Sequence, residues 1–225
     1  MKIQWIMVSV FMPLRSGSKS ITNKNIKLFN GKPLCYWALK ACQDSNLINE
    51  IIVAIDSKKY KNIISNFKFD KINFYNRKPV NSKDISSTES VILEYLSTNT
   101  LPFDSIFILV QATSPHIKSI ELDEMILKSQ SKNKDIVSCV RLKRFIWGEN
   151  GVPINYNINK RPRRQDFEGL LVENGAVYIS RVKKIIESNC RVSGRISLYE
   201  MNENSFFEID EDQDFLISEL LMKRF

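Results

Sequence analysis

Short apolar runs alternate with helix-like segments along most of the 225-residue chain, and this alternation constrains the fold more than any single motif. The apolar runs predict strands at residues 3–12, 51–55, 72–75, 105–110, 136–140, 172–179 and 196–199. The segments between them predict helices at residues 33–43, 58–67, 119–129, 181–188 and 211–222, and a capping-box pattern at residues 86–89 predicts one more. Because such alternation is typical of β-α-β units, it predicts an α/β fold with a mostly parallel sheet.

The loop after the first apolar run is basic and rich in hydroxyl groups. It reads Met-Pro-Leu-Arg-Ser-Gly-Ser-Lys-Ser-Ile-Thr-Asn-Lys-Asn over residues 12–25. Gly17 lets the backbone approach a ligand closely. Positive charge comes from Arg15, Lys19 and Lys24. Consecutive N–H groups in such a loop can hold an anion, so this is a candidate polyphosphate site, although the Walker A pattern is absent. The alternative is an ordinary basic surface loop.

Ligands of open α/β sheets bind beyond the carboxyl ends of the strands. The loops that follow the first strand, Ile55 and Val110 all meet this condition. We therefore expect the functional site at the edge of the sheet where these three loops lie.

Length and composition bound the class of protein. The chain suits one domain over residues 1–225, and its 43% hydrophobic and 26% charged residues are ordinary for a soluble globular protein. No segment has the roughly 20 apolar residues of a membrane span. The apolar start is better explained as a first core strand than as a signal peptide, because no small-residue cleavage site follows it. We therefore expect no membrane partner.

The cysteines and the net charge indicate the cellular location and the kind of molecule that the protein binds. The four cysteines, at positions 35, 42, 139 and 190, lack the spacing of a metal site and indicate reduced thiols in a cytoplasmic protein. The net charge of +8 fits small anionic substrates. There is no arginine-rich tract, zinc-finger spacing or aromatic RNA-binding motif, so we expect no nucleic-acid partner.

Two carboxylates near the end of the chain form a candidate metal site. Glu208 and Asp210 are two residues apart on an extended segment, so their side chains face the same side. Carboxylates beside phosphate groups are a usual setting for Mg²⁺, which takes its other oxygens from substrate and water. The alternative is that Asp210 caps the last helix while Glu208 is solvated.

Seven short motifs follow one another between residues 13 and 210. They are Pro13-x-Arg15-Ser16-Gly17-Ser18-Lys19 with Asn23-Lys24-Asn25 and Gly31-Lys32-Pro33-Leu34; Ile52–Ser57; Arg77-x-Pro79 with Asp84–Thr88; Leu109–Pro115; Arg163–Asp166; Glu173–Ile179; and Glu208-Ile209-Asp210. In this order they resemble the motifs of the acylneuraminate cytidylyltransferases, which are the CMP-sialic acid synthetases and their relatives that activate legionaminic and pseudaminic acids. The resemblance covers nearly the whole chain.

The resemblance implies a Rossmann-like nucleotide-diphospho-sugar transferase architecture with a small dimerisation or sugar-pocket insertion at about residues 141–170. It implies transfer of CMP from CTP to the anomeric hydroxyl of a nonulosonic acid of the sialic, legionaminic or pseudaminic type, with release of pyrophosphate. The implied cofactor is Mg²⁺, or Mn²⁺ in its place, and the implied assembly is a homodimer.

The resemblance also assigns roles to individual residues. It implies catalytic roles for Arg15, Lys19 and Asp210. It implies nucleotide contacts for Arg15, Ser18, Lys19, Lys24, Asn25, Arg77 and Thr88. It implies contacts with the sugar acid for Gln111, Arg164, Gln165 and Glu173, and metal ligation by Asp210 and Glu208. Without the resemblance, Arg77 and Arg164 read as solvated arginines and Gln111 as a loop amide bonded to nearby backbone.

Three departures from the family pattern bear on activity. Glu208 stands where the family usually has Asp, Ser20 where it has Gly, and His116-Ile117 where it has Leu-Arg. His116 is the only histidine, and we expect it to pack in its loop rather than act as a base. Two other functions stay open. One is the same chemistry on Kdo or another sugar, and the other is a non-catalytic nucleotide- or nucleic-acid-binding α/β protein.

Overall fold

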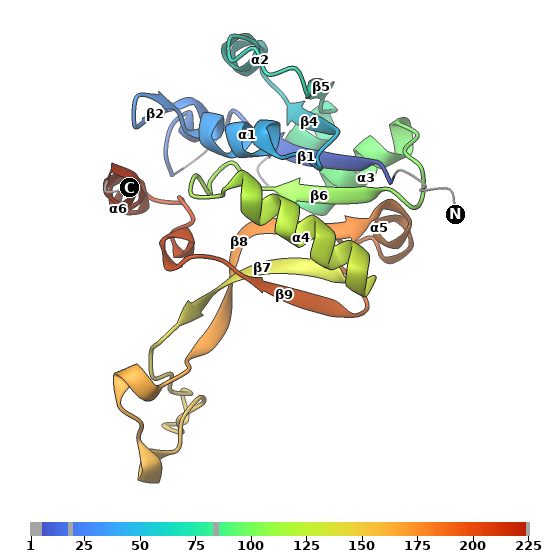
Figure 1. Cartoon of the computed structure of the whole chain (residues 1–225). Coiled ribbons are helices and arrows are strands. Elements are labelled where there is room, and N and C mark those ends of the chain that lie inside the picture. The colour runs from blue at the N-terminus through green and yellow to red at the C-terminus, as the bar shows by residue number, and fades with distance from the viewer. Residues whose placement is uncertain (1–5, 18–19, 83–85, 224–225) are drawn as a thin grey trace.

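A seven-stranded sheet forms the centre of the structure, a computed structural model that describes residues 6–17, 20–82 and 86–223 (Figure 1). Its strands are β1 (Val8–Leu14), β4 (Glu50–Ile55), β5 (Ile72–Asn76), β6 (Ile106–Val110), β7 (Asp135–Leu142), β8 (Leu170–Arg181) and β9 (Ile196–Glu200). A separate two-stranded sheet pairs β2 (Leu28–Phe29) with β3 (Lys32–Pro33). The α-helices are α1 (Leu34–Asp44), α2 (Lys58–Ser65), α3 (Thr88–Thr98), α4 (Ser119–Lys132), α5 (Val182–Ser188) and α6 (Asp212–Lys223). Short 3₁₀ helices are η1 (Lys24–Ile26), η2 (Pro79–Ser82), η3 (Ile158–Lys160), η4 (Arg164–Asp166) and η5 (Glu203–Phe206).

The strand order β5-β4-β1-β6-β8-β7-β9 combines parallel and antiparallel pairs. Strand β1 is parallel to β4 and β6, and β5 and β9 are parallel to their neighbours. In this sheet, strand β8 is antiparallel to both of its neighbours, β6 and β7. The prediction of a mostly parallel α/β sheet is therefore confirmed. In the register, Leu14 lies opposite Ile55 and Phe11 opposite Leu109, so the loops after β1, β4 and β6 meet at one edge, called the carboxyl edge below.

Helices cover both faces of this sheet (Figure 1). Successive side chains of a strand point to opposite faces, and β1 shows the consequence. Val10 and Met12 pack with residues of α1, α2 and α4, whereas Phe11 packs with residues of α3 and α5. All three side chains are fully buried. The sheet is thus buried on both faces, as expected for parallel strands joined by helical crossovers.

Several strands extend beyond the expected residues, among them β1 and β8. Strand β1 ends at Leu14 rather than at residue 12, because its pairing with β4 continues to the carboxyl edge. Strand β8 covers residues 170–181 rather than 172–179, because its antiparallel pairing with β7 continues to Leu142 and its pairing with β6 extends to Arg181. Both extensions depend on a partner strand, which local sequence patterns do not reveal.

The start of helix α3 also differs from its predicted form. The N-cap is Ser87, whose hydroxyl accepts a hydrogen bond from Ser90 N at 3.1 Å, and no Ser86–Glu89 capping box forms. Glu89 instead binds Arg191, which is 102 residues further along the chain.

Between β7 and β8 the chain extends into an arm, residues 143–169, which projects away from the sheet (Figure 1). An aromatic cluster holds the arm together: the ring of Phe145 lies 4.5 Å from that of Tyr156 and 4.8 Å from that of Phe167. The guanidinium of Arg161 lies 4.3 Å from the centre of the Phe145 ring. The arm therefore has a small core of its own.

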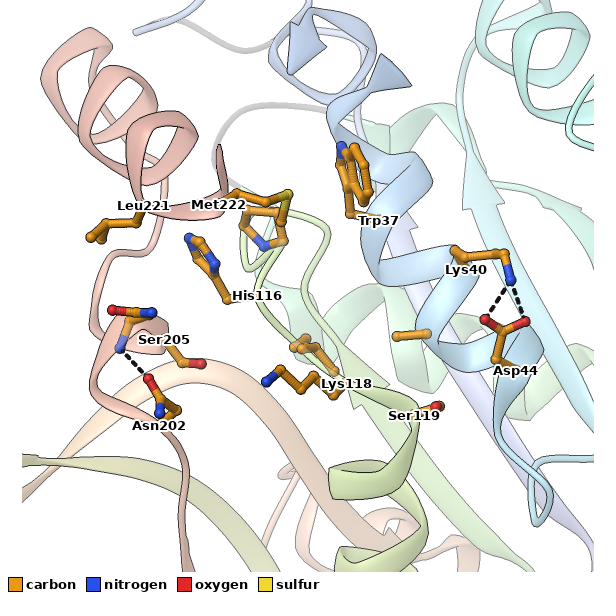
Figure 2. A pocket seen from close by; sticks show the side chains of 14 residues that line it. Trp37, Lys40, Asp44, His116, Lys118, Ser119, Asn202, Ser205, Leu221 and Met222 are labelled. Atoms are coloured by element: carbon orange, nitrogen blue, oxygen red, sulfur yellow. Dashed lines mark hydrogen bonds and ion pairs between the residues drawn. The ribbon is translucent and has the colours of Figure 1, made fainter. Parts of the chain in front are cut away.

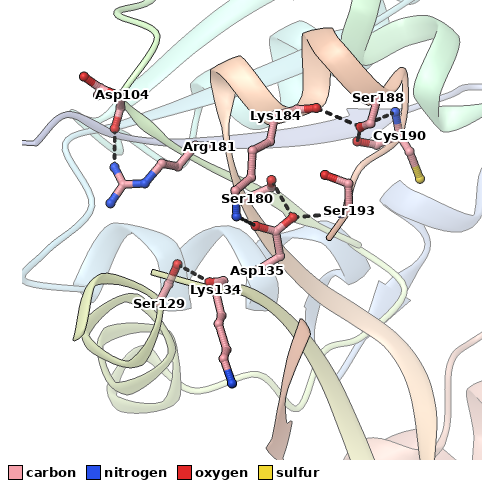
Figure 3. A network of polar contacts seen from close by, with 10 residues as sticks. All are labelled: Asp104, Ser129, Lys134, Asp135, Ser180, Arg181, Lys184, Ser188, Cys190 and Ser193. Carbon is pink, nitrogen blue, oxygen red and sulfur yellow. Dashed lines mark hydrogen bonds and ion pairs between the residues drawn. The ribbon is translucent and has the colours of Figure 1, made fainter. Parts of the chain in front are cut away.

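At the opposite end of the sheet from the carboxyl edge, a buried acid joins three elements (Figure 3). Asp135, at the start of β7, has a side chain that is 1% exposed and accepts hydrogen bonds from Lys184 Nζ at 2.7 Å and Ser180 Oγ at 2.8 Å. The backbone N–H of Ser193 donates to the same carboxylate at 2.8 Å. These contacts fasten β7 to β8 and α5.

The described part of the chain contains no helix that is both long and apolar enough to cross a membrane. Its cysteines are free thiols, and three of them are buried. Burial raises the pKa of the Cys35 and Cys42 thiols to about 12, which makes both unreactive core residues.

Candidate functional site

The loop after β1 is held by contacts from two neighbouring loops. Ser16 N donates to the Asp56 carboxylate, at 3.0 Å to Oδ1 and 3.3 Å to Oδ2. Asn25 Nδ2 donates to the backbone oxygen of Arg15 at 3.1 Å. These bonds fix the backbone beside Arg15 at the carboxyl edge. Ser18 and Lys19, two of the expected nucleotide contacts, lie outside the described residues.

Arg77 comes to the same edge from the chain beyond β5. Its backbone N–H donates to Ile55 O at 2.8 Å, next to Asp56. Burial lowers the pKa of the Arg77 guanidinium, the charge of Asp56 opposes this shift, and the positive charge of Arg15 adds to it. Among the described residues, the buried Nε of Arg77 has no hydrogen-bond partner. The guanidinium groups of Arg15 and Arg77 lie within electrostatic range of each other, and that of Arg77 has an N–H without a partner in the described part of the chain. Together they form a site suited to an anion.

Lys24 connects this cationic region to the end of the chain. It lies in η1, its side chain is 11% exposed, and Nζ donates to Ile209 O at 2.7 Å and to Asp210 Oδ1 at 2.9 Å. The Asp210 side chain is 68% exposed. Asp210 therefore faces Lys24, while the first turn of α6 is capped by Asp214, whose carboxylate accepts from Asp210 N and Glu211 N.

Glu208 lies against β8 and the end of β6. Its Oε1 accepts a hydrogen bond from Thr113 Oγ1 at 3.2 Å, and the backbone oxygen of Thr113 accepts from Ile209 N at 3.0 Å. Burial and the charge of Asp210 raise the pKa of Glu208. Gly175 has a φ of +69°, and a Cβ there would lie 2.5 Å from Glu208 Oε2. A glycine is therefore required beneath the carboxylate.

A buried amide holds the segment before Glu208 in place. Asn174 accepts a hydrogen bond from Ser138 Oγ at 2.7 Å and donates from Nδ2 to Ser205 O at 3.0 Å. Ser138 Oγ in turn accepts from Val177 N at 2.8 Å. Through Asn174, β7 and β8 fix η5 and thereby the position of the two carboxylates that follow.

The expected sugar-acid residues fall into two groups. Gln111 follows β6 and its backbone N–H donates to Ala176 O at 3.0 Å, so it lies at the carboxyl edge beside β8. Glu173, on β8, is exposed and accepts a hydrogen bond from Tyr178 Oη. Arg164 and Gln165 are exposed and lie in η4, on the arm that projects away from the sheet (Figure 1). Within one chain the structure does not bring this second group together with the first.

Glu208 and Asp210 are the residues that could hold a metal ion. No cluster of three or more His, Cys, Asp or Glu side chains suited to a metal occurs among the described residues. Two carboxylates fit an ion that takes its remaining ligands from phosphate and water, as Mg²⁺ does. Asp210 Oδ1 is already bonded to Lys24 Nζ, so metal binding there competes with or rearranges this ion pair.

Thr88 is half-buried at the first position of α3. His116 lies elsewhere, in a cavity of about 490 Å³ between α1, the start of α4 and α6 (Figure 2). Its Nε2 is 2.9 Å from Ser218 Oγ, and burial lowers its pKa. None of the expected site residues that the structure describes lines this cavity. His116 thus packs against α6, which agrees with its interpretation as a packing residue.

Three residues at the site were not assigned a role from the sequence. Asp56 could have been found, because an acid directly after a strand of a parallel sheet lies at the carboxyl edge. Thr113, inside the Leu109–Pro115 motif, holds the Glu208–Ile209 segment. Arg191 gave no signal, because its partners Glu89 and Tyr178 are distant in the sequence.

Comparison with known proteins places this geometry in a family. The chain matches the family model described as cytidylyltransferase over residues 10–221. It is 34% identical over 219 residues to N-acylneuraminate cytidylyltransferase B of Danio rerio, a match that covers 94% of this chain and 50% of that protein. It is 33% identical over 226 residues to N-acylneuraminate cytidylyltransferase A of the same fish, covering 97% of this chain and 51% of that protein.

A solved structure of CMP:2-keto-3-deoxy-manno-octonic acid synthetase in complex with CTP has the same fold. It superposes with a TM-score of 0.70 at 15% sequence identity, covering 97% of this chain and 99% of that chain. The chain spans about half the length of these two relatives. Because the family model covers nearly all of the sequence, the chain belongs to the cytidylyltransferase family.

Proposed function

We propose that the protein transfers CMP from CTP to the anomeric hydroxyl of a nonulosonic acid and releases pyrophosphate. The observation that carries the proposal is the convergence of Arg15, Arg77 and Lys24 with the carboxylates Glu208 and Asp210 at one edge of the sheet. Cations there suit a triphosphate, and two adjacent acids suit the metal that accompanies it. Membership of the cytidylyltransferase family supports CTP as the nucleotide.

In this proposal the cationic residues bind and orient the nucleotide. Arg15 and Lys19 contact the triphosphate, with Ser18 beside them, and Lys24 and Asn25 hold the nucleotide from η1. Arg77 and Thr88 face the base and ribose. Fixing the triphosphate lets the sugar hydroxyl attack the α-phosphorus in line. The new P–O bond forms as the bond to pyrophosphate breaks, and the hydroxyl proton is released to water.

Glu208 and Asp210 would hold Mg²⁺ or Mn²⁺. When bound, such an ion neutralises charge on the triphosphate oxygens. Glu208 is half-buried and lies against Gly175 and Thr113, whereas Asp210 is exposed and paired with Lys24. The two carboxylates therefore play unequal parts, with Asp210 the more accessible ligand.

The sugar acid is placed between β8 and the end of β6. Gln111 and Glu173 supply hydrogen-bonding groups there. Arg164 and Gln165 supply the groups for the sugar carboxylate, because a guanidinium can bond both carboxylate oxygens. Since the arm carries these two residues away from its own sheet, we propose a homodimer in which each arm reaches the site of the other copy.

Exposed apolar side chains on the arm support this assembly. Val152, Ile154 and Ile158 are 56%, 63% and 57% exposed. Several exposed apolar side chains on one projecting segment favour a surface that a partner covers. The substrates and the reduced thiols fit a cytoplasmic location.

A nonulosonic acid is favoured over Kdo as the acceptor. The chain is 34% identical to an N-acylneuraminate cytidylyltransferase, compared with 15% to the solved synthetase for the eight-carbon acid, which supports the fold alone. The cation and carboxylate groups at the carboxyl edge also favour catalysis over a non-catalytic binding role.

The test is a matrix of four nucleoside triphosphates and several acids, with pyrophosphate release as the readout. We expect CTP with a sialic, legionaminic or pseudaminic acid and Mg²⁺ to give turnover, and ATP, GTP and UTP to give little. If Kdo were the one acid that supported turnover, the acceptor would be Kdo and not a nonulosonic acid. Binding of CTP without turnover on any acid would leave a non-catalytic protein.

A further inference from the structure

Four side chains from three parts of the fold form a connected network beside the site, the Glu89–Glu173 network. Arg191, which follows α5, places Nε 2.5 Å from Glu89 Oε1 at the start of α3. Its guanidinium carbon lies 5.0 Å from the centre of the Tyr178 ring on β8. The Tyr178 hydroxyl donates a hydrogen bond to Glu173 Oε1.

The network is buried at its centre, at Tyr178, and exposed to solvent at one end, at Glu173. The Tyr178 residue is 6% exposed, and the side chains of Arg191 and Glu89 are 24% and 26% exposed. Glu173 is exposed. A buried ring that is held by a guanidinium on its face and by a hydrogen bond at its hydroxyl has little freedom to rotate. The carboxylate that accepts this bond is thereby aimed in one direction.

The network also lies within electrostatic range of the carboxylate pair. Burial raises the pKa of Glu208 above its usual value, and the charge of Arg191 counteracts this shift. Burial, with the Glu173 hydrogen bond, raises the pKa of Tyr178 strongly, and the charge of Glu208 contributes. The hydroxyl of Tyr178 is therefore a hydrogen-bond donor at neutral pH, and Glu173 is its acceptor.

We infer that Arg191 is a positioning residue, which acts through Tyr178 to aim the Glu173 carboxylate at a hydrogen-bond donor, a hydroxyl or amide N–H, on the sugar acid. This inference rests on the proposed function and deepens it. It assigns the recognition of a neutral donor group of the substrate to β8, separate from recognition of the substrate carboxylate. Arg191 itself touches no reacting atom in this role.

The test compares Michaelis constants for the sugar acid and for CTP in matched variants. Glu173→Gln should raise the KM for the acid about 10-fold, because the charged acceptor of the hydrogen bond becomes a neutral amide oxygen. Arg191→Met, which keeps the aliphatic stem but removes the guanidinium, should raise the same KM by a comparable factor with the KM for CTP changed less than about twofold. Arg191→Lys should restore only part of the affinity, since it keeps the charge for Glu89 without the planar group over Tyr178.

The double variant Arg191→Met with Glu173→Gln separates positioning from general damage. If Arg191 acts through Glu173, the KM of the double variant for the acid should be no higher than that of the single variant with the higher KM. Additive losses, an unchanged KM for the acid in Arg191→Met, or an equal rise in the KM for CTP would overturn the inference. Arg181→Met is the control, because that arginine lies at the other end of β8 and donates to Asp104 O.

Failure of the inference and of the proposed function give different results. If the wild-type protein turns over a nonulosonic acid and the Arg191 variants keep its KM, only the inference is wrong. If the wild-type protein turns over no acid in the matrix, both are wrong. Melting temperatures of all variants, measured beside the kinetics, show whether a change in KM occurs in a folded protein.

Discussion

At the residue scale, the position of Glu208 depends on the absence of a side chain at Gly175. The glycine has a φ of +69°, and an added Cβ would lie 2.5 Å from Glu208 Oε2 and 3.1 Å from its Cδ. The carboxylate is also held by Thr113. The Asn-Gly pair in the sequence reads as a plain turn, yet it lies within β8 and makes room for a functional group.

Gly175→Ala should therefore lower turnover and raise the Mg²⁺ concentration needed for half-maximal rate, because the new methyl group displaces Glu208. The left-handed backbone alone should cost about 1–2 kcal/mol of stability. Gly31→Ala is a matched control, since Gly31 has a φ of +76° with nothing within 4 Å of its Cβ position. It should lose similar stability and keep the wild-type metal dependence. Equal metal titration curves for both variants would show that Glu208 is not at the metal site.

The carboxylate pair gives a second prediction at this scale. Asp210→Asn should nearly abolish activity, because it removes charge at the ion, while Glu208→Asp should retain activity. Glu208→Gln should raise the Mg²⁺ requirement more than it changes the affinity for the sugar acid. A Mg²⁺ titration of the three variants checks this. A normal rate and normal metal dependence in Asp210→Asn would leave Asp210 only as the ion-pair partner of Lys24.

The sequence indicates which residues of the site are chemically suited to it, but not how they meet. Glu208 and Asp210 stand out as a pair of acids two residues apart. Their contacts with Thr113 and Lys24 join residues 95 and 186 positions apart, so no local pattern reveals them. The carboxyl edge itself could be predicted, because parallel strands align their ends.

At the scale of elements, the antiparallel strand β8 organises the site. It lies between β6 and β7, and it carries Glu173, Asn174 and Gly175 to the carboxyl edge. Alternating strands and helices could be predicted from apolar periodicity. The order β6-β8-β7-β9 could not, because it depends on pairing between strands that are distant in the sequence.

The buried Asp135 holds this part of the sheet together, which gives a stability prediction. Asp135→Asn should destabilise the protein by about 2–4 kcal/mol, because Lys184 loses its partner and the hydrogen bonds from Ser180 and Ser193 weaken. The control is Glu187→Gln on α5, the helix that carries Lys184. The Glu187 side chain is 62% exposed, and its Oε1 lies 3.9 Å from Lys183 Nζ. It should change stability by at most about 0.5 kcal/mol. Urea denaturation of both variants measures the difference, and equal midpoints would contradict the role of Asp135.

At the scale of the whole molecule, one chain does not assemble all of the expected site. The arm carries Arg164 and Gln165 away from the sheet (Figure 1), whereas Arg15, Arg77 and Lys24 lie at the carboxyl edge. The sequence predicts an irregular segment here, because residues 144–165 have no clear apolar period. A homodimer with exchanged arms would complete both sites.

Mixed dimers test this arrangement. Arg164→Ala and Asp210→Asn should each be nearly inactive alone, but a mixture refolded or co-expressed together should recover about a quarter of the wild-type rate. The reason is that half of the dimers are mixed, and one of their two sites then combines an intact Asp210 with an intact arm. No recovery in a mixture shown to contain mixed dimers would place Arg164 at the site of its own chain, or at none.

The central claim, CMP transfer to a nonulosonic acid, is tested most directly by ³¹P NMR of the wild-type protein with CTP, Mg²⁺ and each acid. The account predicts that the three CTP resonances are replaced by equal amounts of pyrophosphate and one new phosphodiester, and only when a suitable acid is present. Formation of CDP and phosphate, or persistence of CTP with every acid while CTP demonstrably binds, would contradict it.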